Sequence, residues 1–171
     1  SLAEVRENKD QRIDSDFWTK EPYRNPLLVY EPIGDHLARS QYGVSIEMNE
    51  DGEGVPIYRM NEIHHMVCDL DISKYAKLDD TQAKQFRLQP GDVLFNRTNS
   101  YEWVGRTGLY VGSKGEAPVF ASYLVRFQTK KTTLLPEMMV AFLGSRYGVA
   151  EVKRRSRQSI NQTNVNPEEV K

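Results

Sequence analysis

A turn followed by a short apolar strand and a polar run constrains the fold of this chain more than any other feature. Pro90, Gly91 and Asp92 are turn residues, and they lead directly into the apolar stretch Val93–Phe95. The strand that this pattern predicts is followed at once by Asn96–Ser100, whose side chains donate or accept hydrogen bonds. Such a strand end is either a capped end in a surface loop or a rigid base for residues that bind a ligand.

Short strands separated by turns are predicted from about residue 42 to residue 127. The stretches 55–60, 107–111 and 119–127 are rich in β-branched and aromatic residues, and the glycine-containing stretch 49–54 reads as a loop. Many short strands at this spacing favour an antiparallel sheet or a barrel.

Helices are predicted at both ends of this β-rich region. Residues 136–154 carry apolar side chains at helical spacing, with Pro136 in the first turn and basic residues at the C-terminal end. A second helix is predicted to start at Asn166–Glu169, where an N-cap residue is followed by proline and two acids. Shorter helices are expected at residues 33–37 and in the charged arm at residues 1–17.

The predicted fold class is therefore α+β. We expect a β-rich antiparallel sheet or barrel-like body with a C-terminal helix and a short N-terminal helical arm. A chain of 171 residues suits one domain of ordinary size. The expected division is a helical arm or linker at residues 1–30 and a folded domain at residues 31–171.

The composition predicts a soluble globular protein. Charged residues make up 27% of the chain and hydrophobic residues 39%, and no apolar run approaches the roughly 20 residues that span a bilayer. Residues 1–20 do not resemble a signal peptide, and the single Cys68 favours a reducing compartment. Because the chain begins at Ser1 rather than Met, we expect it to be a piece of a larger protein.

Charge is distributed unevenly although the net charge is only −1. Residues 47–80 contain nine acidic and three basic residues, whereas residues 128–158 contain seven basic and two acidic ones. This asymmetry indicates either a basic surface for a polyanion or a solvated helix end.

The sequence contains no recognisable catalytic constellation. It has no phosphate-binding loop, no dinucleotide glycine fingerprint, no Gly-x-Ser-x-Gly and no Asn-Pro-Pro-Tyr loop for methylation of nucleic-acid amines. Adjacent His64 and His65 on a strand would point to opposite faces, which disfavours a metal site. Cys68 lies in the most acidic stretch and is better explained as a buried thiol than as a nucleophile. We therefore expect no catalytic residue and no metal ligand.

Polar groups with the geometry to read DNA bases follow two predicted strands. Arginine matches the paired acceptors of guanine, and asparagine matches the acceptor and donor of adenine. For the aromatic residues, packing at the sheet rim is an alternative explanation. The candidates for base reading are Arg59, Asn61, Arg97, Asn99, Ser100, Tyr101 and Trp103.

Basic and amide side chains further along the chain suit the DNA backbone. Lysine and arginine contacts to phosphates position a protein on DNA without carrying sequence information. The candidates for phosphate contact are Arg106, Lys153, Arg154, Arg155, Arg157, Gln158, Asn161 and Gln162.

Several motifs together resemble one protein family. The stretch Gly91–Ser100, followed by Val104–Thr107, looks like the target recognition domain of type I restriction-modification specificity subunits. The stretches Gly54–Ile63, Phe120–Arg126 and Ser159–Asn164 agree with the same family and follow its order. Each motif alone is moderately specific, but the four in order are strong, and they cover about residues 33–171.

The resemblance implies an α+β recognition domain without catalytic residues, which reads one half of an interrupted target in double-stranded DNA. It also implies partners in a prokaryotic cytoplasm, namely methyltransferase subunits and a motor-nuclease subunit. The cofactors S-adenosylmethionine, ATP and magnesium would belong to the parent complex and not to this chain. The parent could be a two-domain specificity subunit or a single polypeptide that fuses methyltransferase and recognition domain.

Two functions from other classes stay open on the sequence alone. The chain could serve mainly to dock the methyltransferase, through its apolar C-terminal helix and charged N-terminal arm. A free-standing enzyme is the third possibility, for which the sequence offers no constellation.

Overall fold

The computed structural model describes residue 6, residues 25–64 and residues 66–171. The predicted helical arm at residues 1–17, and most of the segment 1–30, lie outside the described residues. Within the described ranges, no helix combines the length and the apolarity needed to cross a bilayer.

The central element is a six-stranded sheet in which distant parts of the chain alternate. Its strand order is β1-β10-β6-β8-β4-β3, and every pair is antiparallel except β4 and β8. The strands are β1 (Leu37–Tyr42), β10 (Leu124–Thr129), β6 (Val93–Asn96), β8 (Thr107–Leu109), β4 (Val67–Cys68) and β3 (Ile63–His64).

Both faces of the central sheet are covered, which explains the continuous apolar run in β6. Val93 and Phe95 point to one face, where they join a core cluster with Phe127 of β10. Leu94 points to the other face and joins Leu124 in a second cluster. This alternation is the two-residue period of an extended strand, and all four residues of β6 are buried because neither face meets water.

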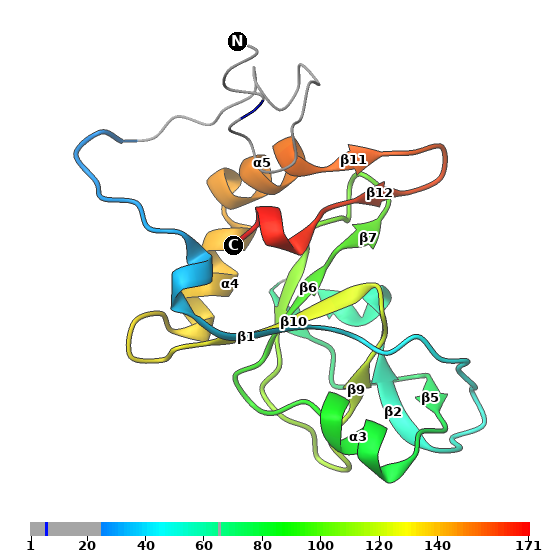
Figure 1. Cartoon of the computed structure of the whole chain (residues 1–171). Coiled ribbons are helices and arrows are strands. Elements are labelled where there is room, and N and C mark those ends of the chain that lie inside the picture. The colour runs from blue at the N-terminus through cyan, green and yellow to red at the C-terminus, as the bar shows by residue number, and fades with distance from the viewer. Residues whose placement is uncertain (1–5, 7–24, 65) are drawn as a thin grey trace.

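Two helices cover the first face of the sheet (Figure 1). They are α4 (Pro136–Gly144) and α5 (Arg146–Arg155), and their buried Met139, Val140, Leu143 and Val152 complete the first cluster. Beyond them the chain ends in the short 3-10 helix η3 (Pro167–Glu169).

A smaller subdomain lies at the opposite end of the molecule (Figure 1). It contains the three-stranded sheet β5-β2-β9, in which β2 and β9 are parallel. Helix α3 in this region begins after Asp79, whose carboxylate accepts hydrogen bonds from two backbone N–H groups of the first turn. The elements here are β2 (Val55–Tyr58), β5 (Tyr75–Ala76), β9 (Val119–Phe120) and α3 (Asp80–Phe86).

A second small sheet projects from the central sheet, with the order β11-β12-β7. Its strands are β11 (Arg157–Gln158), β12 (Thr163–Asn164) and β7 (Thr98–Asn99). Two further 3-10 helices, η1 (Ile33–His36) and η2 (Met60–Glu62), precede β1 and β3 respectively.

Asp92 of the Pro-Gly-Asp turn is a structural residue. Its carboxylate accepts a hydrogen bond from the Gln89 backbone at 3.0 Å and one from the Gln128 side chain at 2.7 Å. It also pairs with the guanidinium of Arg126 at 3.2 Å, and both side chains are almost fully buried. The turn motif therefore fixes β6 to β10 through an internal ion pair.

The α+β class is confirmed, and two details of the predicted fold are corrected. Of the two expected forms of the body, the structure has the sheet, since its strands do not close into a barrel within the described residues. The single strand expected at residues 119–127 is two strands, because the chain turns at residues 121–123 and β9 joins a different sheet from β10. The single helix expected at residues 136–154 is broken at Ser145, whose hydroxyl accepts a hydrogen bond from the Gly148 backbone and so caps α5.

Candidate nucleic-acid interface

The small sheet β11-β12-β7 joins two polar motifs that are far apart in the sequence. Thr98 and Asn99 of β7 pair with β12, and the Thr98 hydroxyl donates a hydrogen bond to the Asn164 side chain at 2.7 Å. The backbone N–H of Val165 donates to the carbonyl of Arg97 at 2.9 Å and continues the pairing. Candidates from both motifs are thereby held on one rigid support (Figure 1).

The tip of the β11–β12 hairpin presents further polar groups to solvent. The Ser159 N–H donates to the Gln162 carbonyl at 2.8 Å and closes the turn. The predicted candidates Gln158, Asn161 and Gln162 are all exposed on this hairpin, and Ile160 at its tip is 99% exposed. The hairpin therefore presents its polar side chains to solvent, away from the core.

The loop at residues 100–106 is clamped to helix α5. Val104 is buried in the main core, and Gly105 has a positive φ of 87°. A Cβ atom at Gly105 would collide with the side chain of Val152, so only glycine lets the loop approach α5 this closely. The N–H of Gly105 also donates to the Asn96 carbonyl at 2.8 Å, which ties the loop back to the end of β6.

Two aromatic side chains of this loop each make a cation–π contact with a basic side chain of the protein. The guanidinium carbon of Arg106 lies 3.1 Å from the centroid of the Trp103 ring. The ammonium of Lys153 on α5 lies 4.5 Å from the centroid of the Tyr101 ring. Both aromatic residues are more than two-fifths exposed, so they lie at the surface rather than in the core. They carry cationic side chains on their faces, as cation–π geometry requires.

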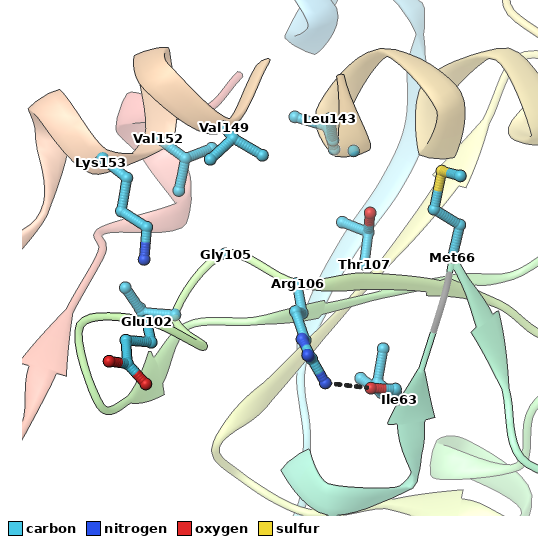
Figure 2. Close-up of a pocket in the computed structure, with 12 residues that line it drawn as sticks. Ile63, Met66, Glu102, Gly105, Arg106, Thr107, Leu143, Val149, Val152 and Lys153 are labelled. Carbon is cyan, nitrogen blue, oxygen red and sulfur yellow. Dashed lines mark hydrogen bonds between the residues drawn. The ribbon is translucent and has the colours of Figure 1, made fainter. Parts of the chain in front are cut away.

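A pocket of about 260 Å³ opens beside these pairs (Figure 2). Ile63, Leu143 and Val149 contribute apolar walls, and Glu102 and Lys153 contribute charge. Burial lowers the pKa of Lys153, and the negative charge of Glu102 acts in the opposite direction. The pocket thus combines an apolar floor with ionisable groups supplied by the loop and by α5.

The predicted base readers Arg59 and Arg97 are engaged within the protein. The guanidinium of Arg59 pairs with the carboxylate of Glu62 and donates to Ser73 at 3.1 Å. Arg97 lies 5.3 Å from the centroid of the Tyr42 ring, and its Nε is buried. Glu62 and Ser73 occupy the guanidinium fork of Arg59, whereas Arg97 makes a ring contact and no side-chain hydrogen bond within the described residues. Asn61, two residues after Arg59, is the more exposed candidate of that segment.

The basic segment after residue 152 is only partly available to phosphate. Arg154 is 8% exposed and pairs with Glu151 at 3.2 Å, and Arg155 pairs with the same carboxylate. The structure therefore gives no support to Arg154 as a surface contact. Arg157 is an exposed residue whose side chain lies 3.4 Å from Glu169.

Sequence reasoning did not select Asn164 or Ile160. Asn164 pairs with Thr98 and so helps to hold β12 against β7. It could have been selected from the sequence, because it lies in the same Asn- and Gln-rich segment as the candidates Asn161 and Gln162. Ile160 gave no signal, because one apolar residue in a polar run is common. Ser100 accepts two backbone hydrogen bonds in the loop and contributes mainly to its shape.

The histidine and cysteine residues do not form a metal centre among the described residues. No group of three or more His, Cys, Asp or Glu side chains there could hold a metal ion. His64 lies 3.3 Å from Asp69, and His65 lies outside the described residues. Cys68 is buried, and burial raises the pKa of its thiol to about 12, so the thiolate nucleophile is disfavoured.

The fold and this interface define an α+β domain whose polar and aromatic surface is formed by the β11-β12-β7 sheet and the loop at residues 100–106. Two known proteins are similar to it in sequence. The chain is 30% identical over 119 residues to the type I restriction enzyme EcoKI specificity subunit of Escherichia coli strain K12, covering 69% of this chain and 25% of that protein. It is 26% identical over 142 residues to a protein named as the type I restriction enzyme MjaX specificity subunit in Methanocaldococcus jannaschii, covering 81% and 33%. No family model matches the chain.

Solved structures support the same fold. The HsdS subunit of Thermoanaerobacter tengcongensis superposes with a TM-score of 0.52 at 16% identity, over 91% of this chain and 38% of that chain. A chain from a study of complex assembly and conformational transition in a type I restriction-modification system gives a TM-score of 0.58 at 16% identity, over 86% and 35%. The chain thus spans about a quarter to two-fifths of the length of these four proteins. The motifs in the sequence resemble the same class of proteins, the specificity subunits, that the two sequence relatives are named for.

Proposed function

We propose that this chain is the target recognition domain of a type I restriction-modification specificity subunit. It binds double-stranded DNA in a sequence-dependent manner and reads one half of a bipartite target. The observation that carries the proposal is the pairing of β7 with β12, which joins two polar motifs in one small sheet whose β11–β12 hairpin is exposed.

The chemistry of this surface supports recognition of base edges. Asn99, Asn161 and Gln162 carry amide groups of the kind that pair with adenine, and the adjacent loop carries Arg106 on an indole face. A two-stranded ribbon such as β11–β12 fits the major groove of B-DNA. A single recognition module of this size buries about 600–1,000 Å² of protein surface on DNA.

Catalysis and cofactors belong, in this proposal, to partner subunits. The methyltransferase subunits would bring S-adenosylmethionine, and the motor-nuclease subunit would bring ATP and magnesium. The names of the relatives support a specificity subunit as the parent rather than a fused methyltransferase. Because the protein would act on chromosomal DNA, we place it in a prokaryotic cytoplasm.

A docking role towards the methyltransferase is a second candidate function. Leu135, Met138 and Phe142 lie on the outer side of α4 and are each about half exposed. They form an apolar face on the helix whose other side packs on the central sheet. Recognition and docking are compatible, because the polar interface lies on the β11-β12-β7 sheet and its loop rather than on this face.

Selection from random duplex DNA tests the proposed function. The purified chain is mixed with duplexes that carry a randomised stretch, bound duplexes are recovered at moderate salt, and the pool is sequenced over successive rounds. We expect a short motif to be enriched, with binding that weakens steeply as salt rises. Enrichment of no motif over several rounds, at salt concentrations where binding is measurable, would contradict sequence-dependent recognition.

A further inference from the structure

The guanidinium of Arg106 lies over an aromatic ring and makes little use of its hydrogen-bond donors within the protein. Only its Nη1 has a hydrogen-bond acceptor within the described part of the chain, the Ile63 carbonyl at 3.4 Å (Figure 2). That contact is long, so the donors of the fork are available to a ligand. The fork of Arg59, by contrast, is taken up by Glu62 and Ser73.

The backbone around Arg106 is fixed on both sides. Its carbonyl accepts a hydrogen bond from Asn96 at 2.8 Å, and its N–H donates to the Trp103 carbonyl at 3.3 Å. The next residue begins the core strand β8, and the preceding Gly105 packs against α5. The contact with the face of the Trp103 ring, 3.1 Å from its centroid to the guanidinium carbon, then restricts where the guanidinium can lie. A side chain held in this way loses little conformational entropy when it binds.

The surroundings of Arg106 favour a base edge over a phosphate. The carboxylate of Glu102 lines the same pocket beside the Lys153 ammonium and offsets its charge, so the pocket is not the purely cationic site that suits a phosphate. Glu102 would instead suit the exocyclic amine of cytosine, which donates a hydrogen bond in the major groove. The planar fork of arginine matches the O6 and N7 acceptors of guanine, which lie in one plane.

We propose that Arg106 is a specificity-determining residue that reads a guanine in the major groove, with Trp103 as its positioning residue. The sequence had placed Arg106 among the phosphate contacts. This inference rests on the proposed function, because it assigns one base of the target to one side chain of the same interface.

Exchange of the side chain at residue 106 tests the inference. The full chain and its variants Arg106→Gln and Arg106→Ala go through the same selection from random duplexes. With Arg106→Gln we expect the motif to change from guanine to adenine at one position and to stay the same elsewhere, because glutamine pairs with adenine. With Arg106→Ala we expect the preference at that position to fall by about 10- to 100-fold.

Two controls separate base reading from other roles. Lys84→Ala removes one positive charge from α3, at the far end of the molecule (Figure 1), and should leave the motif unchanged. Trp103→Phe keeps an aromatic face for Arg106, whereas Trp103→Leu removes it and should weaken the preference at the same position as Arg106→Ala. Circular dichroism confirms that each variant is folded before selection, and the Gln variant serves if the Ala variant is not folded.

The possible outcomes are distinguishable. If the parent chain enriches a motif and both Arg106 variants keep every position of it, the base-reading role is wrong. Loss of affinity for all sequences alike, with a salt slope smaller by about one, would make Arg106 a phosphate contact. If the parent chain itself enriches no motif, the proposed function fails first, and the assignment of Arg106 fails with it.

Discussion

Replacement of Asp92 by alanine should strongly lower the free energy of unfolding of this domain. The effect should be larger than the one expected for a residue of a surface recognition motif. Asp92 receives hydrogen bonds from the Gln89 backbone, the Gln128 amide and the Arg126 guanidinium. Its side chain is only 4% exposed, and that of Arg126 only 3%. The substitution therefore leaves a buried cation without its counter-charge.

The magnitude follows from that burial. Removal of one partner of a buried ion pair costs about 3–5 kcal/mol, because the remaining charge is left uncompensated. Arg126 keeps three acceptors, the backbone carbonyls of Arg87 at 2.9 Å and Gln85 at 3.2 Å and the side-chain oxygen of Gln41, so the lower part of this range is expected. With a urea m-value of about 2 kcal/mol per molar, the unfolding midpoint should fall by roughly 1.5–2 M.

Urea titration followed by circular dichroism measures this shift. Asp51→Ala, on an exposed loop, is the matched control and should change the free energy of unfolding by less than about 0.5 kcal/mol. The double variant Asp92→Leu with Arg126→Met should be more stable than Asp92→Ala, because no unpaired charge is then buried. Equal midpoints for Asp92→Ala and Asp51→Ala would refute the structural role of the pair.

Three further substitutions or treatments test other features. Gly105→Ala should destabilise the domain by about 1–3 kcal/mol in thermal unfolding, because its φ is positive and an added Cβ meets Val152, whereas Gly115→Ala in open space should not; equal effects would disprove the clamp. Burial raises the pKa of the Cys68 thiol to about 12 in the folded protein, whereas an unfolded cysteine titrates at about 8.5. The free energy of unfolding should therefore be unaffected by this thiol below a pH of about 8.5, and should fall by about 1.4 kcal/mol per pH unit as the pH rises from there towards 12. Iodoacetamide should therefore label Cys68 slowly in the native protein at pH 8 and quickly in urea, and fast native labelling would show that the thiol is accessible. Ser145→Ala should cost about 1 kcal/mol in urea unfolding by removing the cap of α5, and an unchanged midpoint would mean that the cap is dispensable.

Local chemistry made part of the fold predictable. The turn at residues 90–92, the strand that follows it and the capped 3-10 helix after Asn166 are each determined by neighbouring residues. Strand β1 was not predicted, because half of its residues are polar and several are exposed, so its sequence lacks a clear two-residue period. The division of 119–127 into two strands has no glycine or proline to announce it.

The candidate site was predictable only in outline. The motifs around Asn99 and Asn164 each carry amide side chains, but their pairing in one sheet depends on contacts between residues 64 and 66 positions apart in the sequence. The engagement of Arg59 with Glu62 and of Arg154 with Glu151 is local in sequence, at three-residue spacing, and could have been weighed from the sequence. The stacking of Arg106 on Trp103 depends on the turn of the loop and on the close approach to α5, which the sequence did not reveal.

The pairing of β7 with β12 has a consequence for the redesign of this domain. A chimera that receives only one of the two polar segments from a homologue would place a foreign strand beside a native one and lose the hydrogen bond between Thr98 and Asn164. Transfer of a new specificity should therefore require both segments from the same donor. The two halves of this small sheet therefore form one structural unit for any exchange of segments, although more than sixty residues separate them along the chain.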